Sequence, residues 1–144
     1  MPIRRTVRSA PSTCLCRAPR VDKLLAGRRI LIVEDEMLVL MMAEDCLEDM
    51  GCSNVSAAAT VAQALDLIGA NRFDAAMLDM NLNGERSDAV ADALTVQGVP
   101  FMFATGYGMP GIRDGDRHRP VLTKPYQFSD IEALFETMLP RAVA

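Results

Sequence analysis

Apolar and polar positions alternate in two ways along residues 29–139 of this 144-residue chain. Short, almost continuous apolar runs are typical of strands that are buried on both faces. Such runs cover residues 29–34, 54–58, 74–78, 100–104 and 120–123. The segments between and after them carry apolar side chains at helical spacing, with polar residues on the opposite face. This alternation predicts a parallel sheet that is covered by helices on both faces.

Helical periodicity also predicts which side chains face the core. The helix over 37–50, the helix after Thr60 and the last helix of the chain each carry one apolar stripe. The residues expected on these stripes are Val39, Met42, Cys46, Leu47, Met50, Val61, Ala64, Leu65, Ile68, Ile131, Leu134, Phe135, Met138 and Leu139. Thr60 with Gln63, and Ser129 with Glu132, match the capping box that starts a helix. A further helix is expected near 86–97.

One region interrupts the alternation where a fourth helix belongs. Residues 106–115 contain Gly106, Gly108, Pro110, Gly111 and Gly115. Each interior glycine disfavours a helix by about 1 kcal/mol and an interior proline by about 3 kcal/mol. The fourth helix is therefore expected to be short or disordered, with at most one turn formed.

The charge of the chain is divided unevenly. Eight of the 15 basic residues and one of the 19 acidic residues fall within 1–29, so residues 30–144 carry seven basic and 18 acidic residues, a net charge of −11. We predict a flexible basic extension over 1–26 and one packed domain over 27–141. The acidic domain argues against a nucleic-acid surface, although the basic extension leaves phosphate binding as a minor alternative.

The expected location is the cytoplasm. The basic N-terminal segment lacks the apolar stretch of a signal peptide, and no run of about 18 apolar residues is present that could span a membrane. Cys14, Cys16, Cys46 and Cys52 do not resemble a disulfide framework, so reduced thiols are predicted. We therefore expect a soluble protein with no membrane partner.

Residues with chemical potential follow the predicted strands. Glu34, Asp35 and Glu36 follow the first strand, and Asp79 follows the third, while Thr105 and Lys124 follow the fourth and fifth. Because ligands bind at the carboxyl ends of strands in open parallel sheets, these side chains are expected to converge. Clustered carboxylates repel one another without a cation, and Mg²⁺ is a suitable one. An aspartate beside a lysine and a hydroxyl can accept a phosphoryl group covalently.

Four segments carry a resemblance to a known family. ILIVEDE (30–36), MLDMNLNG (77–84), FATG (103–106) and LTKPY (122–126) resemble the signature segments of the CheY-like receiver domain of response regulators. The resemblance extends over residues 29–139. It implies a flavodoxin-like (βα)5 three-layer sandwich, with a five-stranded parallel sheet of order 2-1-3-4-5.

The resemblance also implies roles for individual residues. Asp79 would be the phosphoacceptor, Thr105 the switch hydroxyl and Lys124 the phosphate-binding lysine. The residues implied to form the acidic pocket and hold Mg²⁺ are Glu34, Asp35, Asp79 and Asn81, the last through its main-chain carbonyl. A cis peptide bond is expected before Pro125.

PFMFATGYG (100–108) is similar to the motif of the FAT GUY group of single-domain receivers, which lack a well-formed fourth helix. Most receivers carry an aromatic switch residue at the position of Val121. Our hypothesis is that Tyr107 takes over this role, whereas the alternative is a loop tyrosine that merely covers the strand edge. Glu36 is interpreted as a first-turn acid of its helix, and His118 as a surface residue.

The expected function is that of a single-domain response regulator, not of an enzyme acting on other substrates. A histidine kinase or a histidine phosphotransfer protein would phosphorylate Asp79, and a downstream protein partner would bind the 106–119 segment, the last strand and the last helix. The chain would be a monomer or a phosphorylation-dependent dimer. Two alternatives stay open, a Mg²⁺-dependent phosphohydrolase with an aspartyl-phosphate intermediate and a receiver-like module that binds partners without phosphorylation.

Overall fold

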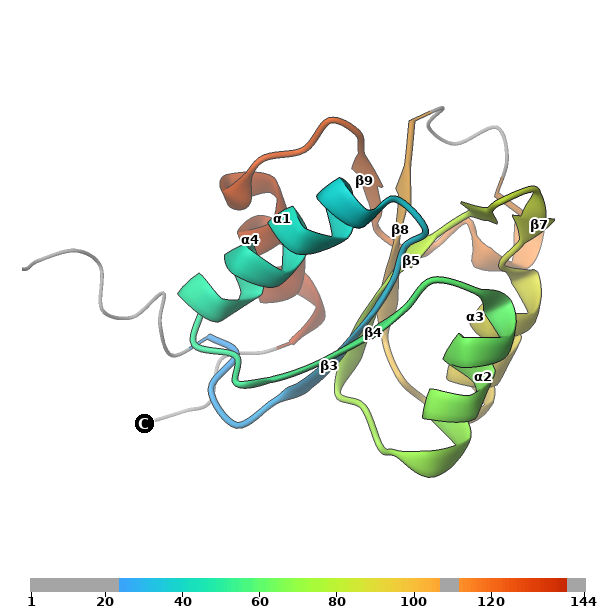
Figure 1. Ribbon diagram of the computed structural model, residues 1–144, viewed down its shortest axis with the longest axis horizontal. Helices are drawn as coiled ribbons and strands as arrows, with labels where there is room; N and C mark the ends of the chain where they lie inside the picture. The colour runs from blue at the N-terminus through green and yellow to red at the C-terminus, as the bar shows by residue number, and fades with distance from the viewer. Residues whose placement is uncertain (1–23, 107–111, 140–144) are drawn as a thin grey trace, which may run out of the picture.

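The computed structural model describes residues 24–106 and 112–139, which are built around a five-stranded parallel sheet (Figure 1). The strands are β3 (Arg29–Val33), β4 (Asn54–Ala58), β5 (Ala75–Asp79), β8 (Phe101–Thr105) and β9 (Val121–Thr123). They lie in the order β4-β3-β5-β8-β9, and neighbouring strands pair in parallel throughout. The predicted order 2-1-3-4-5 is therefore confirmed.

Helices cover both faces of this sheet. The α-helices of the described residues are α1 (Met37–Asp49), α2 (Val61–Ala70), α3 (Asp88–Val96) and α4 (Phe128–Met138). Figure 1 shows α1 and α4 on one face and α2 and α3 on the other. Successive strand side chains point to opposite faces, so Ile30 and Ile32 join the cluster under α1 and α4 while Leu31 joins the other. The predicted three-layer sandwich is confirmed.

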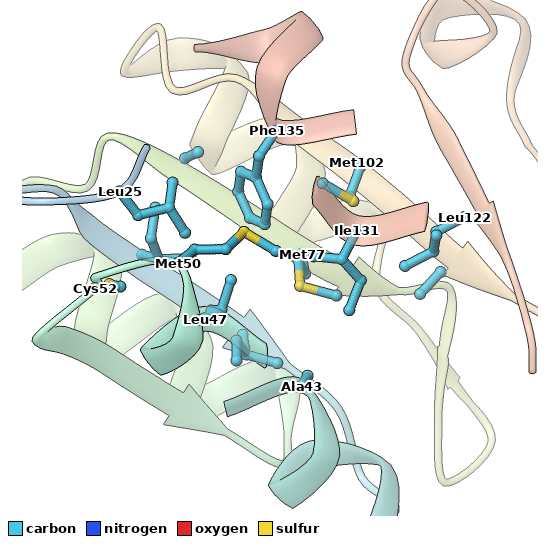
Figure 2. Close-up of a cluster of buried hydrophobic side chains, with 14 of the residues drawn as sticks. Leu25, Ala43, Leu47, Met50, Cys52, Met77, Met102, Leu122, Ile131 and Phe135 are labelled. Carbon is cyan, nitrogen blue, oxygen red and sulfur yellow. The ribbon is translucent and has the colours of Figure 1, made fainter. Parts of the chain in front are cut away.

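The core under α1 and α4 holds these helices to the sheet. Leu47 of α1 and Phe135 of α4 belong to the same buried cluster as Met77 of β5 and Met102 of β8 (Figure 2). Burying a side chain of this size stabilises the fold by about 1.5–3 kcal/mol. Because both faces of the sheet are packed in this way, the strand ends are held in fixed relative positions.

Two of the side chains predicted to be buried are not. Met42 is 39% exposed and Leu65 is 37% exposed, whereas α1 turns Leu40 and Ala43 toward the sheet. A helix that lies on a sheet covers only a limited stripe of its surface. The first turns of α1 are apolar over a wider arc than this stripe, so periodicity alone selected Met42 and missed Leu40 and Ala43, while the predicted Leu47 and Met50 are buried.

One of the two predicted capping boxes is wrong. The backbone N–H of Gln63 donates to the Thr60 hydroxyl at 3.1 Å, so helix α2 begins at the predicted cap. Helix α4 instead begins at Phe128, and the Asp130 carboxylate accepts from the backbone N–H of Gln127 at 2.9 Å. The predicted pair, Ser129 with Glu132, lies inside the helix because Gln127 and Asp130 provide an earlier start.

The segment between β8 and β9 contains little regular structure in its described part. Residues 112–120 include one short 3-10 helix, η3 (Asp114–Asp116), which agrees with the prediction of a short fourth helix. Ile112 is buried and belongs to the core cluster under α2 and α3. Tyr107 lies among residues 107–111, outside the described residues.

The packed part of the chain starts before the predicted boundary at residue 27. Leu24 and Leu25 are buried, and the backbone N–H of Leu25 donates to the carbonyl of Met50 at 3.1 Å. Residues 1–23 lie outside the described part, so the basic extension stays a prediction. Across 24–106 and 112–139, every helix is too short or too polar to cross a membrane.

Candidate functional site

The carboxyl edge of the sheet brings together the side chains that the sequence places after the strands. Asp79 ends β5, the central strand, and Thr105 ends β8 beside it. Glu34 follows β3, where its backbone N–H donates to the carbonyl of Ala58 at 2.9 Å. Lys124 follows β9, and its N–H donates to the carbonyl of Thr105 at 2.8 Å. The site therefore draws one residue from each of four adjacent strand ends.

Three of these four side chains, Asp79, Thr105 and Lys124, line one cleft. Its described lining consists of Asp35, Glu36, Asp79, Met80, Asn81, Asn83, Arg86, Thr105, Gly106 and Lys124. Glu34 lies below the surface at 3% exposure, and Thr105 is also buried. Deep burial of polar side chains around an open cleft is typical of a preorganised site, because packing removes their rotational freedom.

Lys124 is the cation at the centre of the site. Its Nζ lies 2.8 Å from Oε2 of Glu34 and 3.0 Å from Oδ2 of Asp79. Burial alone would lower the pKa of Lys124, but the hydrogen bonds to these two carboxylates outweigh burial and raise it above its usual value. The lysine is therefore charged and holds Asp79 in place. The predicted cis bond between Lys124 and Pro125 is confirmed.

The acids of the site outnumber this cation. Carboxylate oxygens of Glu34, Asp35 and Asp79 lie within 4.8 Å of one another. Burial, followed by the neighbouring Asp79, raises the pKa of Glu34 to about 7. One lysine cannot balance three carboxylates, so the donor set fits a further hard cation with oxygen ligands, such as Mg²⁺.

A small hairpin that we did not predict supports the acidic cluster. Strands β6 (Asn81–Leu82) and β7 (Glu85–Arg86) pair antiparallel across a two-residue turn at Asn83 and Gly84. Both turn residues have positive φ, 54° and 89°, as the type I′ hairpin turn requires. The sequence signal was the Asn-Gly pair, which is a strong hairpin signal between strands.

The hairpin is tied to the acids by hydrogen bonds. The backbone N–H of Asn83 donates to Oδ2 of Asp35 at 2.9 Å. The N–H of Asn81 donates to Oδ1 of Asp79 at 3.2 Å, while the side-chain oxygen of Asn81 accepts from the N–H of Gly84 at 2.7 Å. These bonds hold the carboxylates of Asp35 and Asp79 in the cleft and place Asn81 beside them.

Of three further residues singled out from the sequence, Glu36 lines the cleft, and Val121 and His118 are not among its described lining residues. Glu36 is largely exposed and lies 3.7 Å from Nζ of Lys124, farther than Glu34 and Asp79. Val121 is half-buried against the core cluster under α2 and α3. His118 is exposed in the turn after η3 and does not line the cleft.

This sheet order, with acids, a threonine and a lysine gathered at its carboxyl edge, defines a CheY-like α/β domain. The family model of the response regulator receiver domain matches residues 30–135. The chain belongs to this family.

Relatives of known name point to the same family. The chain is 31% identical over 115 residues to the phyllosphere-induced regulator PhyR of Methylorubrum extorquens, covering 76% of this chain and 43% of that protein. The chain thus spans less than half the length of this curated relative. It also matches the solution structure of SdrG from Sphingomonas melonis Fr1 at 41% identity and a TM-score of 0.71, covering 80% of this chain and 97% of that one. A BeF3-activated conformation of SdrG, attributed to Pseudomonas melonis Fr1, matches at 41% identity and a TM-score of 0.67, covering 79% and 98%.

Proposed function

We propose that this receiver accepts a phosphoryl group on Asp79 in a Mg²⁺-dependent reaction and signals through contacts with other proteins. The observation that carries the proposal is the position of Asp79, whose Oδ2 lies 3.0 Å from Nζ of Lys124 within the cluster of Glu34 and Asp35. A carboxylate with a fixed cation on one side and further acids on the other suits a covalent phosphoryl acceptor.

The proposed donor is a phosphohistidine of a histidine kinase or a histidine phosphotransfer protein. A carboxylate oxygen of Asp79 forms a bond to phosphorus while the phosphorus–nitrogen bond of the donor breaks. The imidazole leaves with the electron pair of that bond and takes up a proton from solvent. Lys124 and the Thr105 hydroxyl bind oxygens of the transferred group, and Lys124 exchanges part of its contact with the carboxylate for them.

The proposed Mg²⁺ ligands are Asp35, Asp79 and the main-chain carbonyl of Asn81, with Glu34 beside them. When bound, the ion supplies positive charge that neutralises the phosphoryl oxygens. The hairpin bonds are consistent with this arrangement, because each engages one oxygen of its carboxylate, Oδ2 of Asp35 and Oδ1 of Asp79.

The phosphohistidine donor needs a docking surface close to Asp79. Met37, Leu38 and Met41, at the start of α1, are 63%, 81% and 51% exposed and follow directly on Glu36, which lines the cleft. An exposed apolar patch of this kind is typical of a protein-binding surface. We assign it to the histidine-bearing element of the donor.

The proposed readout uses the segment after β8. Phosphorylation recruits Thr105 to the phosphoryl group, and Tyr107, two residues further on, changes its packing with it. If Tyr107→Ala leaves both the lifetime of the phosphorylated state and partner binding unchanged, this readout is wrong. The proposal also includes a cytoplasmic location, which the free thiols of Cys46 and Cys52 support.

Intact-protein mass spectrometry tests the proposed function. The protein is incubated with a small phosphodonor in Mg²⁺ or in EDTA. The expected result is a single added phosphoryl group in Mg²⁺ that is absent in EDTA and absent from Asp79→Asn. An unmodified wild-type protein would contradict the proposal, and many turnovers of the donor per protein would favour a phosphohydrolase instead.

A further inference from the structure

The cleft contains a second basic side chain to which the proposed function assigns no role. Among the described lining residues, Arg86 and Lys124 are the basic ones. The hairpin pairs Arg86 directly with Asn81, two residues past Asp79. The N–H of Ser87 then donates to the carbonyl of Met80 at 3.1 Å, which fixes the end of the hairpin against the residue that follows Asp79. Two short links of backbone therefore hold Arg86 beside the acceptor.

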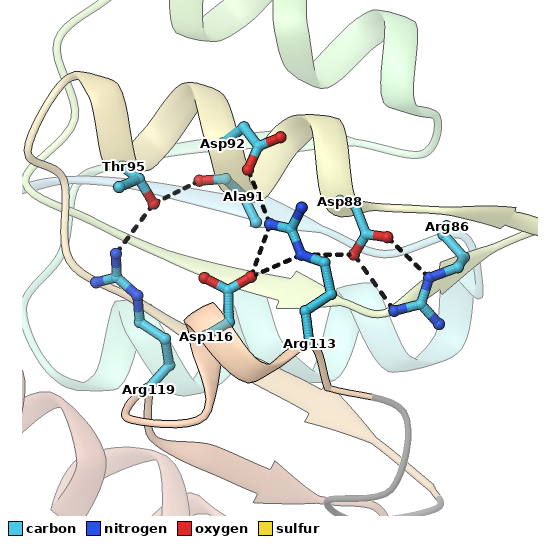
Figure 3. Close-up of polar contacts among 8 residues, drawn as sticks. All are labelled: Arg86, Asp88, Ala91, Asp92, Thr95, Arg113, Asp116 and Arg119. Carbon is cyan, nitrogen blue, oxygen red and sulfur yellow. Dashed lines mark hydrogen bonds and ion pairs between the residues drawn. The ribbon is translucent and has the colours of Figure 1, made fainter.

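Arg86 is bound to a carboxylate that has a second cation available. Its Nε lies 2.9 Å from Oδ2 of Asp88, and its Nη2 donates to Oδ1 of Asp88 at 3.3 Å. On the other side of Asp88, Nε of Arg113 lies 3.5 Å from Oδ1 (Figure 3). If Arg86 moves away, the carboxylate of Asp88 keeps a cationic partner, because Arg113 remains beside it.

The present pair of Arg86 and Asp88 is weak enough to exchange. The side chain of Arg86 is 49% exposed and that of Asp88 is 34% exposed. Exposed ion pairs contribute little, since water screens them and holding two side chains costs entropy. A doubly charged phosphoryl group offers more negative charge and three acceptor oxygens, and the planar guanidinium matches such oxygens in pairs.

Lys124 cannot balance the charge of a phosphoryl group alone, because its ammonium group already faces three carboxylates. Its Nζ has Glu34 at 2.8 Å, Asp79 at 3.0 Å and Glu36 at 3.7 Å. A phosphoryl group carries about 1.5–2 negative charges, which replace the single charge of the free Asp79 carboxylate. A second cation within reach of the cleft is therefore favoured in the phosphorylated state more than in the resting one.

We propose that Arg86 is a phosphoryl-binding residue of this cleft, which exchanges Asp88 for phosphoryl oxygens when Asp79 is modified. The exchange leaves Asp88 to Arg113. Arg113 already binds Asp92 of α3 at 2.8 Å and Asp116 of η3 at 2.7 Å. Phosphorylation thus strengthens the attachment of η3 to α3 at the segment that follows β8. This inference rests on the proposed function of Asp79.

Titrations with beryllofluoride in Mg²⁺, followed by calorimetry, test the exchange. Arg86→Gln is expected to bind beryllofluoride about five- to tenfold more weakly than wild type, because one charge-assisted contact is lost. Arg86→Lys is expected to recover part of this loss. Asp88→Asn is expected to bind about two- to fivefold more tightly, since it removes the carboxylate that lies 2.9 Å from Nε of Arg86. Asp92→Asn, which touches Arg113 and not Arg86, is the matched control and is expected to stay within about twofold.

A titration with Mg²⁺ alone separates this role from a structural one. Removing a positive charge from the cleft is expected to leave the Mg²⁺ affinity of Arg86→Gln equal to or higher than that of wild type, whereas a damaged hairpin would lower it. In the double variant Arg86→Gln with Asp88→Asn, the second substitution is expected to raise the beryllofluoride affinity by no more than Asp92→Asn does in the wild-type background.

Equal beryllofluoride affinity of Arg86→Gln and wild type would overturn the inference, as would parallel losses of Mg²⁺ and beryllofluoride affinity. Failure of the proposed function looks different. In that case wild type itself does not bind beryllofluoride, or Asp79→Asn binds it equally well.

Discussion

Removing the charge of Lys124 is expected to destabilise the metal-free protein. Lys124→Met keeps most of the aliphatic side chain but deletes the ammonium group that lies 2.8 Å from Glu34 and 3.0 Å from Asp79. The two acids are 3% and 8% exposed as residues, so water cannot replace the lost partner well. The variant therefore leaves two carboxylates close together and without their cation.

The magnitude follows from the burial of each group. Breaking a buried ion pair by removing one partner costs about 3–5 kcal/mol. Two features lower this value here. The side chain of Lys124 is 18% exposed, and Glu34, whose pKa is already raised to about 7, can take up a proton. We expect the free energy of unfolding in EDTA at about pH 8 to fall by about 2–3 kcal/mol, and by less at about pH 6, where Glu34 is protonated in both proteins.

Urea unfolding followed by circular dichroism measures this loss, because the chain has no tryptophan for fluorescence. Arg117→Met is the control, since its pair with Asp114 has side chains 53% and 98% exposed, and a loss below about 0.5 kcal/mol is expected. Added Mg²⁺ is expected to narrow the difference in stability between Lys124→Met and wild type, because the variant has one positive charge fewer in the cleft and binds the ion more tightly than wild type does. If Lys124→Met in EDTA is as stable as Arg117→Met, the assigned role of Lys124 in balancing the acids is wrong.

Three further predictions concern the acids, the core and the donor surface. In EDTA, the stability that Glu34 provides is fully present below its unfolded pKa of 4.5 and is lost as the pH rises through about 7; denaturation at several pH values is expected to show this decline in wild type and not in Glu34→Gln. Phe135→Ala is expected to lower the free energy of unfolding by about 3–5 kcal/mol, because Phe135 is fully buried. The control Val96→Ala, at a side chain 86% exposed, is expected to change the urea midpoint of unfolding very little. Leu38→Glu is expected to slow phosphotransfer from a histidine phosphotransfer protein by at least about tenfold and to leave modification by a small phosphodonor unchanged. Val96→Glu is the control variant. A docking role for this end of α1 would be excluded if Leu38→Glu slowed both reactions equally, or if its phosphotransfer were no slower than that of Val96→Glu.

Much of the fold and of the candidate site could be predicted from the order of residues along the chain. Buried strands are recognisable in the sequence as apolar runs, and parallel strands bring their carboxyl ends to the same edge of the sheet. Asp79, Thr105 and Lys124 were therefore placed together by their position after a strand. The structure confirms this convergence, down to the contact between Lys124 and Asp79.

The errors have a common physical origin in packing. Periodicity reports how apolar a helix face is, but the sheet decides how much of that face it covers, and α1 leaves Met42 at the margin. The start of α4 depends on Asp130 folding back onto Gln127, a local choice between two similar capping pairs. Neither choice can be read from the order of residue types alone.

The place of Arg86 in the cleft was also missed, although the Asn-Gly pair is a sequence signal for the hairpin that carries it. That place depends on the hairpin turn at Asn83 and Gly84, whereas we expected a helix from about residue 86. The ion pairs beyond it join Asp92 to Arg113, which are 21 residues apart. Such a contact requires the segment after β8 to lie on α3, and no local pattern encodes that.

Locating the modified residue tests the central claim most directly. Borohydride reduces an aspartyl-phosphate to homoserine, so treatment after incubation with a small phosphodonor marks the acceptor permanently. Peptide mass spectrometry is expected to find homoserine at position 79 in the presence of Mg²⁺ and to find none in EDTA. Homoserine at position 35 or elsewhere, with position 79 still aspartate, would contradict the account.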